Sequence, residues 1–173
     1  VTNVQIELSS VYDQLLHNIK WWSEAQHFDK KEFISDELSL ANTKSRLRMV
    51  TLYQIAGAKK GIVVGTGNKV EDYGIGFYTK YGDGGVDIAP IADLYKTEVR
   101  ELGGYLGVDA LIIDAKPTDG LWEDGRSDED QIGATYAQLE EAMESGTGDA
   151  VDILSRFNRQ NRHKMEPIPT FKL

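Results

Sequence analysis

A short turn followed by a carboxylate is the first group of residues whose types could do chemistry. Gly65 and Gly67 flank Thr66, and Glu71 follows four residues after Gly67. Glycines let a ligand approach the backbone closely, and Thr66 offers a hydroxyl and an amide. A carboxylate beside such a turn could bind Mg²⁺ together with substrate phosphates. The spacing alone also fits an ordinary glycine turn into a surface loop, with Glu71 in solvent.

A second glycine-rich segment lies between Lys80 and Asp87. Three of the four residues 82–85 are glycine, which indicates backbone angles or close contacts that a side chain would prevent. Lys80 and Asp87 bracket this turn and could together recognise a polar ligand that carries both donors and acceptors. The alternative is a hairpin-like turn closed by a surface ion pair, which contributes little to stability.

Positively charged side chains could gather phosphate groups at two places. Arg46 lies between Lys44 and Arg48 in a predicted helix. Lys96 stands at the start of another predicted helix, where the positive end of the helix dipole favours phosphate oxygens.

A third basic cluster ends the last predicted helix. Basic residues at a helix C-terminus often only stabilise the helix dipole, and we favour this role for Arg156 and Arg159. His163 and Lys164 come just before an extended tail that begins at Pro167. Stabilisation of the helix dipole is therefore a weaker explanation for His163 and Lys164.

Apolar periodicity predicts the helices that must position these side chains. In the first helix, Val11, Leu15, Ile19 and Trp22 should face a core. Further helices are expected at about 37–58, 94–106, from 127 onward and at about 149–164.

Two features set the boundaries and the buried face of the helix that begins at Ser127. Ser127 with Asp130 approximates a capping box. Ile132, Tyr136, Leu139 and Met143 continue the apolar stripe.

Short apolar runs between these helices predict strands. The β-branched run 62–64 is typical of a buried parallel strand. Residues 110–113 form a possible second strand, and the alternating residues 4–8 a third. Strands that alternate with helices predict an α/β fold with a parallel sheet, in which ligands bind beyond the carboxyl ends of the strands. Too few strands are visible for a complete sheet.

Composition limits the class of protein. The chain has 173 residues, a formal net charge of −9 and no cysteine. The charge argues against nucleic-acid binding, and no apolar run is long enough to span a bilayer. The absence of cysteine excludes thiolate chemistry and fits a cytoplasmic protein. The three histidines show no metal-ligand spacing.

Several segments, taken in order, resemble the ammonia-dependent NAD synthetase family, a group of N-type ATP pyrophosphatases. They cover the chain from about residue 40 to its end, and the block from Lys80 to Pro90 is the most specific. The similar segments are 42–49, 65–71, 77–90, 94–96, 116–118, 127–129 and 163–164.

The resemblance implies a fold and a reaction. The fold would be a Rossmann-like parallel sheet flanked by helices, similar to adenine nucleotide alpha-hydrolases, with the N-terminal part of the sheet missing from this chain. The reaction would join ammonia to the nicotinate carboxylate of deamido-NAD. ATP first adenylates that carboxylate and releases pyrophosphate, and ammonia then displaces AMP.

The resemblance also implies a role for each matching residue, with Lys96 as the catalytic residue that stabilises charge on the phosphates. The ATP contacts would be Thr66, Lys96 and Thr118. Glu71 would bind Mg²⁺. The deamido-NAD contacts would be Arg46, Lys80, Asp87, His163 and Lys164.

One part of the family pattern is absent. The phosphate-binding loop Ser-Gly-Gly-x-Asp-Ser has no counterpart in this sequence, and we expect it upstream of Val1. Residues 1–173 would then be the C-terminal two-thirds of a single synthetase domain, unable to bind ATP productively alone. The family forms homodimers with the substrate site at the subunit interface, so Arg46 and the helix around it are expected near that interface.

Three alternatives stay open. Other ATP pyrophosphatases activate carboxylates on a similar fold but lack the block from Lys80 to Pro90. A glutamine-dependent NAD synthetase contains a similar synthetase domain beside an amidase domain. A non-catalytic homologue could serve as a dimerising nucleotide-binding module, although the retained polar residues argue against this. The sequence before Val1 would discriminate between these readings.

Overall fold

The computed structural model describes residues 3–29, 31–122 and 124–171, and within them helices dominate. The elements in chain order are α1 (Ser9–Ala25), α2 (Lys31–Ile34), α3 (Glu37–Lys59), the π-helix η1 (Val70–Ile75), α4 (Lys96–Tyr105), α5 (Ala110–Ile113), α6 (Asp128–Ile132), α7 (Tyr136–Ser145) and α8 (Val151–Met165).

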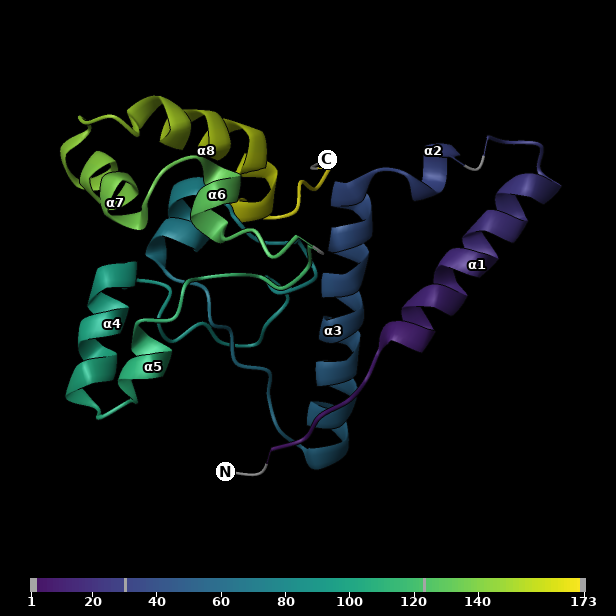
Figure 1. The fold of residues 1–173 in the computed structure, drawn as a ribbon, viewed down its shortest axis with the longest axis horizontal. Helices are drawn as coiled ribbons and strands as arrows, with labels where there is room; N and C mark the ends of the chain where they lie inside the picture. The colour runs from purple at the N-terminus through teal and green to yellow at the C-terminus, as the bar shows by residue number, and fades with distance from the viewer. Residues whose placement is uncertain (1–2, 30, 123, 172–173) are drawn as a thin grey trace.

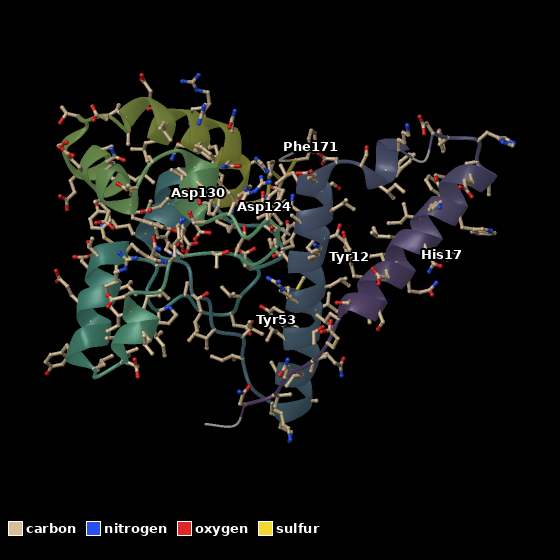
Figure 2. The ribbon with its side chains drawn as sticks, viewed as in Figure 1. Tyr12, His17, Tyr53, Asp124, Asp130 and Phe171 are labelled. Carbon is tan, nitrogen blue, oxygen red and sulfur yellow. The ribbon has the colours of Figure 1, made fainter. Side chains whose placement is uncertain are left out.

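The long helix α3 stands between an arm made of α1 and α2 and a group made of η1 and α4–α8 (Figure 1). Asp36 caps its start by accepting a hydrogen bond from the Ser39 amide at 2.9 Å. Capping of this type satisfies an amide that the helix itself leaves unpaired. The arm contacts α3 through Tyr12, whose ring lies under the Lys44 ammonium at 5.4 Å (Figure 2).

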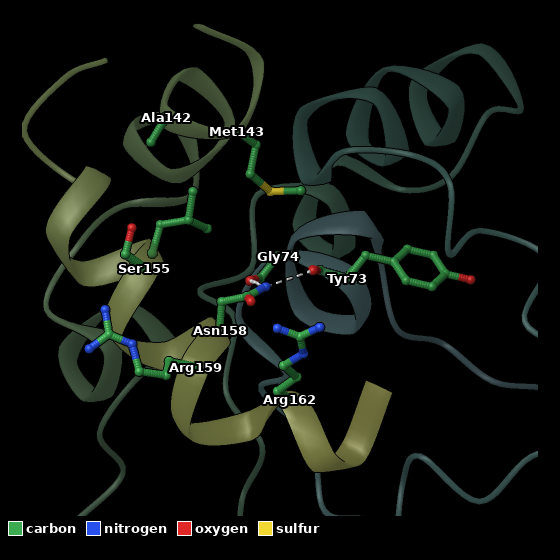
Figure 3. A pocket seen from close by; sticks show the side chains of 9 residues that line it. Tyr73, Gly74, Ala142, Met143, Ser155, Asn158, Arg159 and Arg162 are labelled. Atoms are coloured by element: carbon green, nitrogen blue, oxygen red, sulfur yellow. Dashed lines mark hydrogen bonds between the residues drawn. The ribbon is translucent and has the colours of Figure 1, made fainter. Parts of the chain in front are cut away.

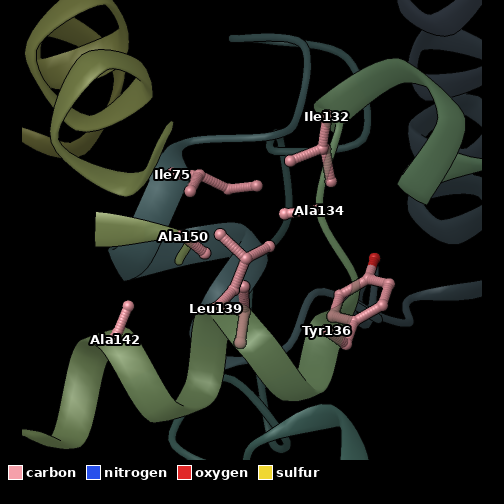
Figure 4. Packing of buried hydrophobic residues seen from close by; sticks show 8 residues of the cluster. Ile75, Ile132, Ala134, Tyr136, Leu139, Ala142 and Ala150 are labelled. Atoms are coloured by element: carbon pink, nitrogen blue, oxygen red, sulfur yellow. The ribbon is translucent and has the colours of Figure 1, made fainter. Parts of the chain in front are cut away.

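The hydrophobic core lies where η1, α6, α7 and α8 meet (Figure 4). Ile75, Ile132 and Leu139 are almost completely buried in it. Gly74 allows η1 to pack this closely, because a Cβ there would lie 2.6 Å from the Met143 sulfur. The predicted apolar stripe of residues 132–143 therefore faces the core, but the single helix predicted from Ser127 is wrong. It is divided in two, because Gly133 ends α6 in the left-handed conformation and Thr135 caps the start of α7.

The expected sheet is reduced to one isolated parallel bridge within the described residues. It pairs Val64 with Ile88. The Gly65 amide donates to the Ile88 carbonyl at 2.7 Å, and the Asp87 amide donates to the Val63 carbonyl at 2.9 Å. The run 62–64 thus pairs in the parallel direction that its composition predicted, but without a ladder.

Two strand predictions are wrong. Residues 110–113 form helix α5, because the Asp109 carboxylate caps them by accepting from the Leu111 amide at 2.8 Å. Residues 4–8 lead into α1 without pairing with another strand in the described part of the chain. A four-residue apolar run does not distinguish a strand from a helix by itself.

The apolar face predicted for α1 is present but is not buried within this chain. Val11 is 50% exposed and Trp22 is 46% exposed. Trp22 instead packs against Phe28 and Phe33 in an aromatic group of tilted and edge-to-face rings, with ring centroids 5.6–5.8 Å apart. No helix in the described ranges is long and apolar enough to cross a bilayer.

Candidate functional site

A cavity of about 880 Å³ lies between α3, the turn after the parallel bridge, the glycine-rich loop and α8. Its volume suits a ligand of nucleotide size. Six of the residues predicted to bind substrates or Mg²⁺ line it. They are Thr66, Glu71, Lys96, Thr118, His163 and Lys164.

A lysine–carboxylate pair marks one end of this cavity. The Lys96 ammonium lies 3.3 Å from the Glu71 carboxylate, and both side chains are mostly buried. Lys96 is the first residue of α4, as predicted. Glu71 is fixed from the other side, because its second oxygen accepts from the Asn68 amide at 3.1 Å. The structure therefore brings together two residues that lie 25 positions apart in the sequence.

A buried tyrosine links this pair to a second carboxylate. The Tyr136 hydroxyl donates to Glu71 at 2.5 Å and lies 3.3 Å from an oxygen of Asp128. Burial, together with the charges of Glu71 and Asp119, raises the pKa of Asp128 above its usual range. Burial and the two carboxylates also raise the pKa of Tyr136, so the phenol keeps its proton.

The sequence patterns did not identify Tyr136 or Asp128 as site residues. Apolar periodicity accounts for Tyr136, and an acidic first helix turn accounts for Asp128. In the structure Tyr136 also contacts the carboxylates of Asp128 and Glu71, which line the cavity. The only earlier signal was the segment 127–129, which resembles the family.

Hydrogen bonds between polar side chains hold the glycine-rich loop against α3. The Asp83 carboxylate accepts from the Ser45 hydroxyl at 2.7 Å and from the Thr79 amide at 3.0 Å. The Thr79 hydroxyl donates to Asn42 at 2.6 Å. A Cβ at Gly82 would lie 2.3 Å from the Ser45 hydroxyl oxygen, so only glycine allows this approach.

Three predicted residues stand outside the cavity lining. The Arg46 guanidinium donates to the Lys80 carbonyl at 3.3 Å, and the Lys80 ammonium donates to the His163 carbonyl at 2.6 Å. Asp87 accepts from the Val63 amide at 2.7 Å and from the Tyr53 hydroxyl at 3.2 Å. Asp87 thus holds the parallel bridge together in this structure.

Two further predicted residues reach the cavity but also hold the chain together. The Lys164 ammonium donates to the carbonyls of Gly76 and Tyr78, at 2.9 and 2.8 Å, and burial lowers its pKa. The Thr118 hydroxyl lies 3.4 Å from the Arg126 carbonyl and accepts from the Gly120 amide. These contacts order the two segments that border the cavity.

A second cavity, of about 460 Å³, lies between η1, α7 and α8 (Figure 3). It contains none of the predicted substrate-binding residues. Asn158 donates to the Tyr73 and Gly74 carbonyls, so its amide group is used in packing η1 against α8. Arg159 and Arg162 at its rim are exposed. Its features are those of an open packing gap.

The residues of the first cavity fit a magnesium ion. No cluster of three or more histidine or carboxylate side chains suited to a metal occurs in residues 3–29, 31–122 and 124–171. Mg²⁺ does not need such a cluster, because it commonly takes one or two carboxylates and completes its shell with water and substrate phosphates. Glu71 and Asp128 offer two carboxylates, and one oxygen of Asp128 is buried without a hydrogen-bond partner.

The fold is similar to that of solved synthetases of nicotinamide nucleotides. The structure superposes on NMN synthetase from Francisella tularensis with a TM-score of 0.81 and 33% identity, covering 100% of this chain and 68% of that one. It superposes on the NH3-dependent NAD synthetase from Campylobacter jejuni with a TM-score of 0.68 and 24% identity, covering 96% of this chain and 64% of that one.

The chain belongs to the NAD synthase family, whose model matches residues 4–168. It is 42% identical to the NH(3)-dependent NAD(+) synthetase of Carboxydothermus hydrogenoformans, over 93% of this chain and 63% of that protein. It is also 42% identical to the enzyme of the same name in Archaeoglobus fulgidus, over 84% of this chain and 61% of that protein. The chain therefore spans less than two-thirds of the length of these relatives.

Proposed function

We propose that the protein containing this chain is an ATP-driven ligase that forms NAD from deamido-NAD and ammonia. The cavity that collects Thr66, Glu71 and Lys96 in a chain of the NAD synthase family carries this proposal. A carboxylate is a poor electrophile, so the enzyme must first convert the nicotinate carboxylate into an acyl adenylate. Ammonia then attacks the acyl carbon, and AMP leaves with the electrons of the broken C–O bond.

The residues of the cavity support each part of this reaction. Lys96 would donate hydrogen bonds to phosphate oxygens from the positive end of α4 and stabilise the charge that develops as pyrophosphate leaves. Thr66 and Thr118 would contact ATP. Glu71 would hold Mg²⁺, which when bound neutralises phosphate charge and polarises the reacting phosphoryl group.

Binding of deamido-NAD is assigned to Arg46, Lys80, Asp87, His163 and Lys164. Three of these already form one connected series of contacts beside the glycine-rich loop, from Arg46 to Lys80 and from Lys80 to His163. Lys164, the next residue in the chain, separately donates to the Tyr78 carbonyl. Since Arg46, Lys80 and Asp87 stand outside the cavity lining, substrate must reach them at the edge of the site. In a homodimer with the site at its interface, the partner subunit would complete that edge of the site.

The larger architecture is also part of the proposal. We propose that residues 1–173 are the C-terminal two-thirds of one cytoplasmic synthetase domain with a Rossmann-like parallel sheet. The exposure of Ile62, Val64 and Ile88, at 58%, 50% and 47%, supports this assignment. β-Branched residues at a parallel bridge are usually covered on both faces.

The test is an assay of the full-length protein with ATP, Mg²⁺, ammonium and deamido-NAD. We expect NAD, AMP and pyrophosphate in equal amounts. Replacement of ammonium by glutamine should give no product unless an amidase domain is present. Absence of NAD under all these conditions would refute the proposal.

A second candidate substrate is nicotinic acid mononucleotide, which the same chemistry would convert to NMN. The superposition on NMN synthetase over the whole chain favours its inclusion. Both substrates present the same nicotinate carboxylate and differ in the adenylate half. A comparison of kcat/KM for the two substrates in the same assay decides between them.

A further inference from the structure

Asp128 carries a buried carboxylate whose hydrogen-bonding capacity is unfilled. Its side chain is 8% exposed. The Oδ1 atom has no hydrogen-bond partner in the structure. The Oδ2 atom accepts only a long hydrogen bond, at 3.3 Å, from the Tyr136 hydroxyl, whose single proton has Glu71 as its nearer acceptor at 2.5 Å. A buried carboxylate with an unpaired oxygen is costly, so such groups are normally paired or bind cations.

Helix capping does not explain this residue. Ser127 and Asp130 already form a reciprocal capping box at the start of α6. Glu129, the third acid of this turn, accepts from the Tyr136 amide at 3.0 Å. The neighbouring residues therefore fulfil the local structural roles, and the Asp128 carboxylate is left facing the cavity.

The charges around Asp128 indicate what it would bind. Glu71 and Asp128 both lie within hydrogen-bonding distance of one phenol, and Lys96 supplies the one cation that contacts Glu71 in the described structure. A polyphosphate would meet excess negative charge at this end of the cavity unless a divalent cation came with it. Two carboxylates with one free oxygen match the partial protein shell that Mg²⁺ prefers.

We propose that Asp128 is a second protein ligand, beside Glu71, for the divalent cation that accompanies the nucleotide. Tyr136 acts as the spacer that holds the two carboxylates side by side, since its phenol contacts both of them. This inference rests on the proposed function only in placing a nucleotide–cation complex in this cavity, and it assigns a role to Asp128 that cation binding itself can measure.

The experiment measures Mn²⁺ binding to the full-length protein by electron paramagnetic resonance. The nucleotide is α,β-methylene-ATP, which cannot be cleaved at the bond that the reaction breaks. We expect Asp128→Asn to weaken Mn²⁺ binding at least tenfold, as does Glu71→Gln. Asp93→Asn is the matched control, because that carboxylate is 95% exposed and pairs with Lys69 away from the cavity.

A folding control accompanies this titration. Without cation, Asp128→Asn should unfold at a temperature no lower than the wild type, because it removes a buried unpaired charge. Addition of Mn²⁺ and the nucleotide should then raise the midpoint of the wild type more than that of the variant. Mn²⁺ binding by Asp128→Asn at wild-type affinity, with Glu71→Gln impaired, would overturn the inference.

The two proposals can fail separately. If the full-length protein forms no NAD but its Mn²⁺ affinity still depends on Asp128, the cation assignment stands and the reaction is wrong. If the protein forms NAD and Mn²⁺ affinity is independent of Asp128, the reaction stands and the cation assignment is wrong.

Discussion

At the scale of single residues, the same side chain often serves the site and the fold together. Asp87 was predicted to bind substrate, and in the structure it ties the Val63 amide to the Tyr53 hydroxyl. Glu71 was predicted from one glycine turn, whereas Tyr136, its hydrogen-bond partner, is 65 positions away. Sequence spacing could identify Glu71, because the glycine turn and the carboxylate lie close together in the sequence. It could not find Tyr136, because only tertiary packing brings the phenol to the Glu71 carboxylate.

Replacement of Lys96 tests the proposed catalytic residue. Lys96→Met keeps the aliphatic stem but removes the ammonium from the end of α4. We expect kcat for NAD formation to fall by about 100-fold or more, the usual loss when one stabilising group for developing charge is removed. Lys69→Met removes a lysine that pairs with an exposed carboxylate outside the cavity, so it should leave kcat unchanged. Steady-state assays of both variants make the comparison, and equal rates would contradict the role of Lys96.

The carboxyl of Asp72 gives a prediction about pH. Burial and the charges of Glu71 and Asp83 raise its pKa to about 6. The folded state therefore binds a proton more tightly than the unfolded state, and the free energy of unfolding falls as pH rises from about 4 to 6. Asp72→Asn should remove this decline and be more stable at pH 7 by about 1 kcal/mol, since partial exposure reduces the full effect. Urea unfolding at several pH values measures the free energy of unfolding of both proteins. If that free energy depends on pH in the same way in both, Asp72 does not contribute.

At the scale of elements, helix starts were predictable and strands were not. Asp130 and Ser127 cap α6 as predicted, and Lys96 opens α4. These signals are local, because a capping residue acts on amides two or three positions away. A strand needs a partner that the local sequence does not specify, and the bridge between Val64 and Ile88 joins residues 24 positions apart. The π-helix η1 also escaped prediction, since it lies in a stretch that reads as irregular loop.

Glycine substitutions at two elements should have opposite effects on stability. Gly82→Ala would force its Cβ against the Ser45 hydroxyl that clamps the loop to α3, and overpacking of this type costs about 1–3 kcal/mol. Gly104→Ala meets nothing within 4 Å in α4 and should stabilise the protein by up to about 1 kcal/mol through helix propensity. Urea unfolding of both variants tests the pair. A stable Gly82→Ala protein would mean that the loop is not held against α3.

At the scale of the whole molecule, the contacts within one chain do not account for the exposed apolar side chains on the arm of α1 and α2. It stands apart from the group around the core, with α3 between them (Figure 1). Its apolar side chains remain exposed, and so do Leu38, Val50 and Leu52 on α3, at 60%, 58% and 52%. The sequence predicted an apolar helix face correctly, but it could not show that this chain would leave the face uncovered. A homodimer through α1 and α3 would bury it and place Arg46 beside the partner.

Trp22 provides the test of that assembly. Trp22→Glu would put a charge into an apolar interface, so we expect a wild-type dimer and a largely monomeric variant by light scattering at micromolar concentration. If the substrate site needs both subunits, the specific activity of Trp22→Glu should fall on dilution. Trp22→Phe is the matched control, because it keeps an aromatic ring beside Phe28 and Phe33 and should remain dimeric. Activity measured over a range of concentrations separates misfolding from dissociation, since a misfolded variant loses activity at every concentration whereas a dissociated one recovers it when concentrated. A monomeric wild-type protein with full activity would remove the dimer from the proposal and leave the exposed arm to another partner.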